Sequence, residues 1–261
     1  MIPRLAGNKL RMFASPRRGM RVLAAQLEKA KPETIVVASP HNLRLHKHVC
    51  VVLSENCSGK VAEGVKWVSL RAKCDLELGR KVLRGAEEMN LPVVGANYGA
   101  FEGPASDLPM DWGTLIPLWF LLGRKKEARR ILVVAPSRGI PLKMNFEFGR
   151  VVGRAAEEGK TRVAFVASSD QAHAHKKDGP YGFSGEAAKY DRKVVEAVKA
   201  ERLASVMEMD PDIVEAAKPD SLWQMTMLAG VLDVVPMKGT LVSYDVPTYF
   251  GMLCASYVRA A

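Results

Sequence analysis

The chain has 261 residues, of which 48% are hydrophobic, and a formal net charge of +10. This length can bury a sizeable core, and we expect one catalytic-type α/β domain over residues 1–261. No apolar run approaches the ~20 residues of a membrane span, and the first residues lack a signal peptide's apolar stretch, which predicts a cytoplasmic protein without a membrane partner. Basic residues are spread throughout and form no aromatic-interleaved motif, which argues against nucleic acid as a partner.

Strand-like and helix-like segments alternate through the first half of the chain. Apolar residues at helical spacing predict a helix that begins at Ser15, just before Pro16, and leads into a strand at residue 34. The segments that follow are predicted as a strand at 49–53, a helix at 75–89 and a short strand at 92–95. The long glycine- and proline-rich loop 96–113 comes next, and loops of that length in compact domains are usually functional.

The second half repeats the strand-helix-strand order. An apolar strand at 130–136 is followed by a helix at 145–158 and a strand that begins at residue 163. The remaining predicted segments are helices at 184–199, from 210 onward and at 221–232, then strands at 240–246 and 253–258. This order predicts an α/β fold whose central sheet is mixed and mostly parallel and is flanked by helices.

All five histidines follow two of the predicted strands. His41, His46 and His48 come after the first, and His173 and His175 come after the strand at 163. In an open α/β sheet, ligands bind at the carboxyl ends of the strands, where loops from different strands meet. The histidines therefore predict one active site at this edge of the sheet.

Several well-known sites are missing from the sequence. It contains no phosphate-binding loop, no dinucleotide-binding glycine motif after a strand, no Gly-x-Ser-x-Gly and no His-Glu-x-x-His. The four cysteines form no Cys-x-x-Cys pair, so neither a zinc knuckle nor a disulfide scaffold is indicated. Histidines and carboxylates at strand ends remain, and such a set with open positions is typical of non-haem iron(II) centres that bind oxygen and a bidentate substrate.

Four motifs follow one another along the chain. They are Ser39-Pro-His41, Asp111-Trp-Gly-Thr-Leu-Ile-Pro-Leu118, Ser168-Ser-Asp170-Gln-Ala-His173 with Gly179-Pro-Tyr181-Gly, and Tyr244-Asp245-Val-Pro. In this order they resemble the motifs of class III extradiol ring-cleaving dioxygenases of the protocatechuate 4,5-dioxygenase β-subunit type. The resemblance spans most of the chain.

The resemblance implies an enzyme that opens a catecholic or aminophenolic ring with O2. In that family two histidines and a glutamate hold iron(II), and a further histidine is the acid/base catalyst. By resemblance, His41 is a metal ligand, Asp245 takes the place of the glutamate, and His173 is the catalytic base. The resemblance also implies a homo-oligomer, or a hetero-oligomer with a related subunit.

Four further residues are candidates for substrate binding or for support of the site. Tyr181 can form a wall for a flat ring, Trp112 can line the pocket, and Asp170 can contact substrate or fix His173 from behind. His48 is close enough in sequence to His41 to be a substitute ligand or a substrate contact. We expect His46 and His175 to face solvent or to form local hydrogen bonds.

Three departures from the family pattern keep alternatives open. The sequence begins just downstream of where the family's first metal histidine lies, Trp112 replaces a histidine of the pattern, and Asp245 is one methylene shorter than glutamate. One alternative is a non-catalytic subunit depleted of metal ligands, such as the α-subunit of 2-aminophenol dioxygenases. Another is a Memo-like binding protein of the same fold.

Overall fold

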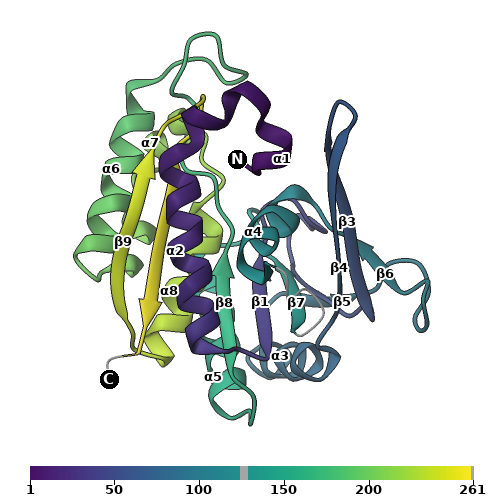
Figure 1. Cartoon of the computed structure of the whole chain (residues 1–261). Helices are drawn as coiled ribbons and strands as arrows, with labels where there is room; N and C mark the ends of the chain where they lie inside the picture. The colour runs from purple at the N-terminus through teal and green to yellow at the C-terminus, as the bar shows by residue number, and fades with distance from the viewer. Residues whose placement is uncertain (124–128, 260–261) are drawn as a thin grey trace.

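The computed structural model describes residues 1–123 and 129–259 and shows a mixed, mostly parallel sheet covered on both faces (Figure 1). The sheet has the strand order β5-β2-β7-β1-β8. Its strands are β1 (Thr34–Ala38), β2 (Val49–Val52), β5 (Val93–Ala96), β7 (Arg130–Ala135) and β8 (Val163–Ala167). Only the β2–β7 pair is antiparallel. The predicted fold class is confirmed.

Two smaller sheets flank the central one. The first has the order β4-β3-β6, from β3 (Asn56–Glu63), β4 (Lys66–Lys73) and β6 (Asp107–Pro109). The second is an antiparallel pair of β9 (Lys238–Asp245) and β10 (Met252–Val258). The β9–β10 pair lies beyond β8, on the left in Figure 1.

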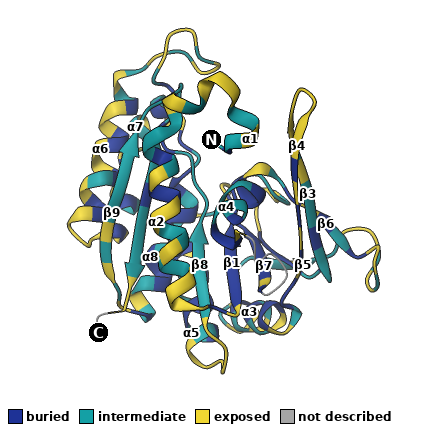
Figure 2. Cartoon of the chain, viewed as in Figure 1, coloured by how far each residue is buried: buried dark blue, intermediate teal, exposed yellow. Residues whose placement is uncertain are grey.

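The helices divide between the two faces of the central sheet. They are α1 (Pro3–Ala6), α2 (Ala14–Ala30), α3 (Leu76–Glu88), α4 (Trp112–Leu122), α5 (Leu142–Glu157), α6 (Gly185–Lys199), α7 (Pro211–Ala217) and α8 (Leu222–Val234), with 3-10 helices at Gly7–Phe13 and Leu203–Glu208. Side chains of α3, α5 and α8 pack on one face of the sheet, whereas α4 and the β3–β4 hairpin pack on the other. Of the strands between these layers, β1 is buried and dark blue in Figure 2, whereas β8 is half-buried and teal. The covered sheet is a rigid scaffold, and it fixes the positions at which the loops after β1 and β8 begin.

Several elements were not predicted from the sequence, and the reasons for β4 and α4 differ. The strand β4 alternates exposed and buried residues, a regular strand signal, but its charged solvent face lowers its overall hydrophobicity. The helix α4 is apolar on all sides and contains Pro117, so its sequence has no helical period to detect. The predicted helix from Ser15 begins at Ala14 instead, because the preceding 3-10 helix runs directly into it.

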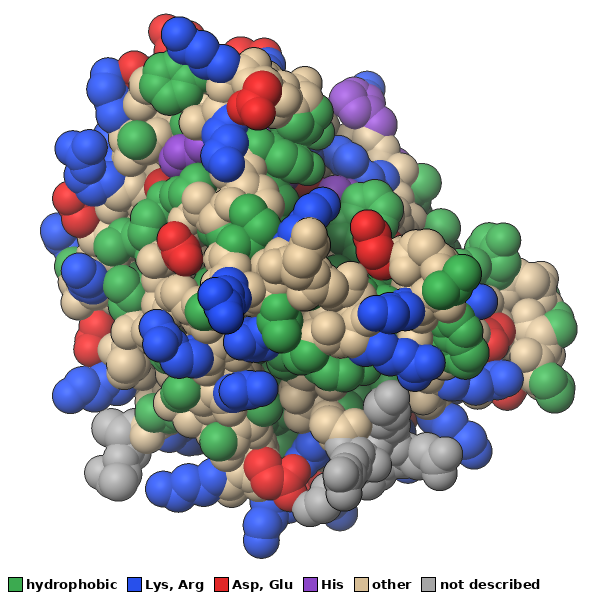
Figure 3. Space-filling view, turned by 45° about the horizontal axis from the view of Figure 1, so that its top comes forward, with side chains coloured by type: hydrophobic (Ala, Val, Ile, Leu, Met, Phe, Trp, Pro, Cys, Tyr) green, Lys and Arg blue, Asp and Glu red, His purple; other side chains and the backbone are tan. Residues whose placement is uncertain are grey.

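The charge of the molecule is distributed over its surface. Figure 3 shows lysine and arginine side chains scattered across one face, with acidic side chains among them. None of the described helices is long and apolar enough to cross a membrane.

Candidate functional site

The loop after β1 is fastened to the beginning of α4. Ser39 Oγ donates a hydrogen bond to Asp111 Oδ1 at 2.8 Å, and Asn42 Nδ2 donates to Asp111 Oδ2 at 2.9 Å. Asp111 also caps α4 by accepting from the backbone N–H of Thr114. A Cβ on Gly113 would lie 2.7 Å from Ser39 Oγ, so this close approach requires glycine. The loop therefore presents His41 in one fixed position.

His41 lies between an acidic group and an aromatic ring. Its Nε2 is 3.5 Å from Asp220 Oδ2, and its ring centroid is 4.6 Å from that of Trp112. Burial lowers the pKa of His41, and the carboxylates of Asp220 and Asp111 partly offset this effect. Trp112 is 56% exposed, so its indole ring covers one side of His41 and leaves its own outer face open.

Asp220 is shared by two positively charged or chargeable groups. Its Oδ1 forms an ion pair with the Arg138 guanidinium, and Oδ2 faces His41. The Arg138 guanidinium also stacks on Trp223, at 4.3 Å from the ring centroid. The backbone N–H of Asp220 donates to the Asp170 carbonyl at 3.2 Å, which joins this group to the loop after β8.

Asp170 is the acidic side chain with the most unusual environment at this edge. Burial, together with the nearby Asp220 carboxylate, raises its pKa to about 7. Its side chain is nevertheless 33% exposed. A carboxyl group that changes its charge near neutral pH and remains accessible can exchange protons with a bound molecule.

His173 lies behind Asp170 and is only 6% exposed. Its Nδ1 is 2.8 Å from the Lys218 carbonyl oxygen, which only accepts, so Nδ1 carries the proton and the Nε2 of neutral imidazole is an acceptor. This Nε2 is 3.9 Å from Asp170 Oδ2. The rings of Tyr181, Tyr249 and Phe250 pack around it, with centroids 5.2, 5.8 and 5.4 Å away.

His175 belongs to a separate network around the buried Asp191 carboxylate. Its Nε2 is 2.8 Å from Asp191 Oδ2, and the Tyr244 hydroxyl donates to the same oxygen at 2.6 Å. The other oxygen, Oδ1, accepts from the backbone N–H of Ala172 at 2.8 Å. The expectation that His175 faces solvent or bonds locally was therefore wrong, because its partner is a buried carboxylate on α6, 16 residues away along the chain.

A large cavity opens beside these residues. It has a volume of about 1170 Å³. One end is lined by His41, Trp112, Asp170, Tyr249 and Phe250. His173 does not line it, so the carboxyl of Asp170 is the group that a bound molecule meets first, with the imidazole behind.

The structure places His46, His48 and Asp245 apart from this cluster. His48 and His46 are exposed in the loop before β2, and neither forms an ion pair within the described part of the chain. Asp245 ends β9, where its Oδ1 accepts from the backbone N–H of Val246, and it makes no ion pair with a described histidine. Tyr181 packs on His173 and is 55% exposed.

Sequence reasoning missed four residues of the site. Tyr249 and Phe250 lie in the β9–β10 loop, and Arg138 and Asp220 precede α5 and α8. A signal for the last two existed, because a charged residue just after a strand or just before a helix often lies at the ligand edge of such a sheet. The ion pair between Arg138 and Asp220 could not be foreseen, because the tertiary structure brings these two residues together.

Three comparisons with known proteins bear on this arrangement. Residues 7–253 match the family described as "Catalytic LigB subunit of aromatic ring-opening dioxygenase". The chain belongs to this family. The LigB match covers nearly all of the described structure, in agreement with the resemblance seen in the four motifs.

One relative matches this LigB chain in sequence, and one solved structure shares its fold. Protein CA_C1420 of Clostridium acetobutylicum is 24% identical over 247 residues, which are 94% of this chain and 52% of that protein. The chain thus spans about half the length of this relative. The crystal structure of the uncharacterized protein JW3007 from Escherichia coli K12 superimposes with a TM-score of 0.61 at 15% identity and covers 92% of this chain and 91% of that one.

The LigB family implies an iron(II) centre, and the side chains described here do not fit one. No group of three His, Cys, Asp or Glu side chains that could hold a metal ion is found among residues 1–123 and 129–259. The Asp220 carboxylate beside His41 is already paired with Arg138, whose positive charge opposes a cation at the same place. Asp245, the predicted third ligand, has no ion pair with His41.

Proposed function

We propose that this LigB chain binds a small phenolic or catecholic ring at the mouth of the cavity and exchanges a proton with it through Asp170. The observation that supports the proposal most directly is the accessible Asp170 carboxyl, whose pKa lies at about 7, among aromatic side chains. Trp112 and the Tyr249–Phe250 pair provide flat apolar surfaces beside it. Aromatic rings prefer offset or edge-to-face contact with such surfaces.

Each residue of the site has its own role in the proposed binding. Asp170 accepts the phenolic proton. The Nδ1 proton of His173 is held by the backbone carbonyl of Lys218, so the Nε2 of this imidazole faces Asp170 as an acceptor and can share the transferred proton. His41 and Trp112 limit the position of the ring. Arg138 balances the charge of Asp220, so that a phenolate can lie near this edge without facing an unpaired carboxylate.

Calorimetric titration with catechol tests the proposal. We expect saturable binding, with cyclohexane-1,2-diol as a non-aromatic control that binds at least about tenfold more weakly, since each aromatic contact contributes roughly 0.5–1.5 kcal/mol. Trp112→Leu should weaken catechol binding, whereas Tyr98→Leu, on a ring of similar exposure far from the cavity, should not. Equal affinity for both diols would contradict the proposal.

The Asp170→Asn variant tests the proton exchange. In the wild-type chain catechol binding should change around pH 7, because the carboxyl titrates there. The observed binding enthalpy should also differ between buffers of unlike ionisation enthalpy at one pH, and this difference gives the number of protons exchanged. In Asp170→Asn this dependence should disappear. Its persistence would assign the titration to another group.

Iron(II)-dependent extradiol ring opening with O2 is the second candidate, and family membership favours it. It needs metal ligands beyond those that the described side chains bring together, and His41 is the residue whose position matches the motif. Anaerobic iron(II) titration, followed by O2 and a panel of catechols and aminophenols, tests it. Stoichiometric iron that His41→Ala removes, with a yellow ring-opened product, would support this activity; no bound iron would favour a non-catalytic or Memo-like binding role.

A further inference from the structure

The cavity extends from the candidate site between two strands. Its lining includes every residue from Val163 to Gln171, along and beyond β8, and every residue from Met252 to Arg259, along β10. Side chains of a strand point alternately to opposite faces. A cavity that touches each residue in turn therefore runs along the backbone edges of the two strands, and we call it the β8–β10 slot.

Both walls of the slot are open strand edges. Within the described residues, β8 pairs only with β1, and β10 pairs only with β9. The two edges meet at one point: Gln171 N–H donates to the Gly251 carbonyl at 2.9 Å, and Gly251 N–H donates to the Ala172 carbonyl at 3.1 Å. Below this point the strands separate, and the backbone groups that face the slot have no strand partner.

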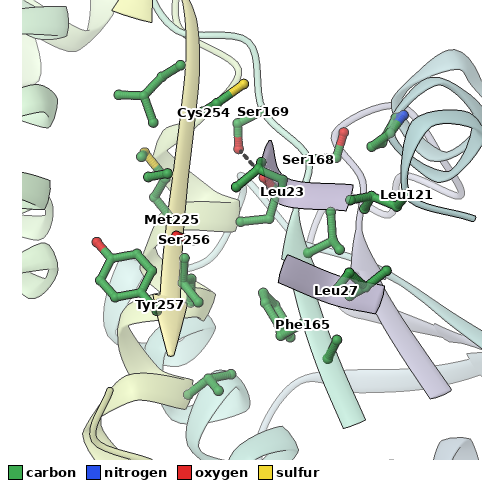
Figure 4. Close-up of a pocket in the computed structure, with 18 of the residues that line it drawn as sticks. Leu23, Leu27, Leu121, Phe165, Ser168, Ser169, Met225, Cys254, Ser256 and Tyr257 are labelled. Carbon is green, nitrogen blue, oxygen red and sulfur yellow. Dashed lines mark hydrogen bonds between the residues drawn. The ribbon is translucent and has the colours of Figure 1, made fainter. Parts of the chain in front are cut away.

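The two faces of the slot are covered by helices, as around an interior strand of an α/β sheet. Leu23 and Leu27 of α2 line one face, and Met225 and Leu228 of α8 line the other. Figure 4 shows labelled members of both sets around the space beside β10. A strand buried on both faces carries apolar side chains in both directions.

Four residues of the lining have a buried polar side-chain atom without a partner. Among the described residues, no hydrogen bond is made by Gln26 Oε1, Gln171 Oε1, Thr248 Oγ1 or Tyr257 Oη. Buried polar groups are almost always hydrogen-bonded, so such atoms indicate a missing polar partner. A purely hydrocarbon ligand would leave these four atoms and both rows of backbone groups unpaired.

We propose that the β8–β10 slot binds an extended polypeptide segment of a partner protein as an added strand, with β-branched or apolar side chains toward both α2 and α8. Its main chain would pair with β8 on one side and with β10 on the other, which would join the five-stranded sheet to the β9–β10 pair. Neighbouring strands lie about 4.8 Å apart, so one strand fills a gap of about twice that width. Strand addition of this kind uses main-chain hydrogen bonds for affinity and side-chain pockets for specificity.

A pair of synthetic peptides tests the role of the backbone. The probe is acetyl-Lys-Val-Thr-Val-Thr-Val-Lys-amide, and its control is the same peptide N-methylated at alternate residues, which keeps the side chains and removes half of the donors. Fluorescence anisotropy on the full chain should show saturable binding of the probe and binding of the control at least about tenfold weaker, because several hydrogen bonds are lost. Equal binding of the two would overturn the proposal in favour of an apolar ligand site, and binding of neither would overturn it altogether.

Matched variants locate the binding. Ser256→Trp places a large ring in the slot from β10, whereas Thr240→Trp changes its cross-strand neighbour on β9, which does not line the cavity. We expect probe binding to fall at least tenfold in Ser256→Trp and to stay within twofold in Thr240→Trp. Hydrogen exchange gives a second readout: backbone amides of β8 and β10 should slow when the probe binds. Unchanged exchange, or equal binding by the two variants, would place the peptide elsewhere.

Discussion

His173 and His175 stand two residues apart on the same loop, yet their surroundings differ in almost every respect. His175 bonds to Asp191 at 2.8 Å, within a network that also holds Tyr244 and the backbone of Ala172. His173 faces Asp170 at 3.9 Å, too far for a direct hydrogen bond, and Asp170 lines an open cavity.

The difference separates a structural pair from a functional one. The Asp191 carboxylate is fully enclosed, and three groups bond to it, so it has a fixed geometry and no access to ligand. One third of the Asp170 side chain is exposed, and its carboxyl group has an incomplete set of hydrogen-bond partners. The closed network fixes the backbone at Ala172, which lies between Asp170 and His173, and thereby positions both side chains.

The largest effect should come from opening the closed network. Asp191→Ala leaves His175, Tyr244 and Ala172 N–H without their acceptor, and breaking a buried pair of this kind typically costs about 3–5 kcal/mol. Urea denaturation should show this loss in the free energy of unfolding. Glu186→Ala, which removes an exposed ion pair on the same helix, should cost less than about 1 kcal/mol. A loss of similar size in both variants would contradict the structural role of the Asp191 network.

Gly251→Ala should disturb the same network from the β10 side. An added Cβ would lie 2.2 Å from Asp191 Oδ2 and 2.9 Å from Gln171 Cβ, so Asp191 or the backbone has to move. Overpacking of this kind costs about 1–3 kcal/mol. Gly185→Ala is the control, because nothing lies within 4 Å of its added Cβ. Unfolding midpoints that do not differ between the two variants would argue against a crowded network.

The two histidines can be compared directly. His175→Leu should lower the free energy of unfolding by about 2 kcal/mol, since it leaves the buried Asp191 short of a partner. His173→Leu should cost about 1 kcal/mol, because only the bond to Lys218 is lost while the apolar contact with three rings remains. A reversed order in denaturant titrations would assign the structural role to His173.

The smallest effect concerns the pH dependence of stability at Asp170. Its pKa in the folded chain is raised from 3.8 to about 7, so between these values the unfolded chain releases a proton that the folded chain keeps. The stability contributed by this proton is complete below pH 4 and is lost as the pH rises through 7. Asp170→Asn removes that dependence, so its unfolding temperature relative to wild type should rise by roughly 1–3 °C from pH 4 to pH 8. A difference that stays constant with pH would contradict the raised pKa.

Local sequence patterns were sufficient for most elements of the fold. The apolar runs at β1, β7 and β8 and the caps at Asp75, Ser184 and Asp210 are local signals, and the structure confirms the corresponding strands and helices. The resemblance of the four motifs to ring-opening dioxygenases is confirmed by the family match. The placement of His41 and Asp170 at one edge also followed from the sequence, because parallel strands end on the same side of a sheet.

Tertiary structure alone decided which polar groups meet. Nothing near His175 in the sequence indicates that Asp191 and Tyr244 enclose it, and nothing near His41 indicates Asp220 and Arg138. These partners come from separate elements, and their distances depend on how α6, α8 and the β9–β10 pair pack against the sheet. The sequence therefore determined the chemical groups at the strand ends, whereas packing determined which of them are enclosed and which face the cavity, since burial and pairing depend on neighbours that are distant along the chain.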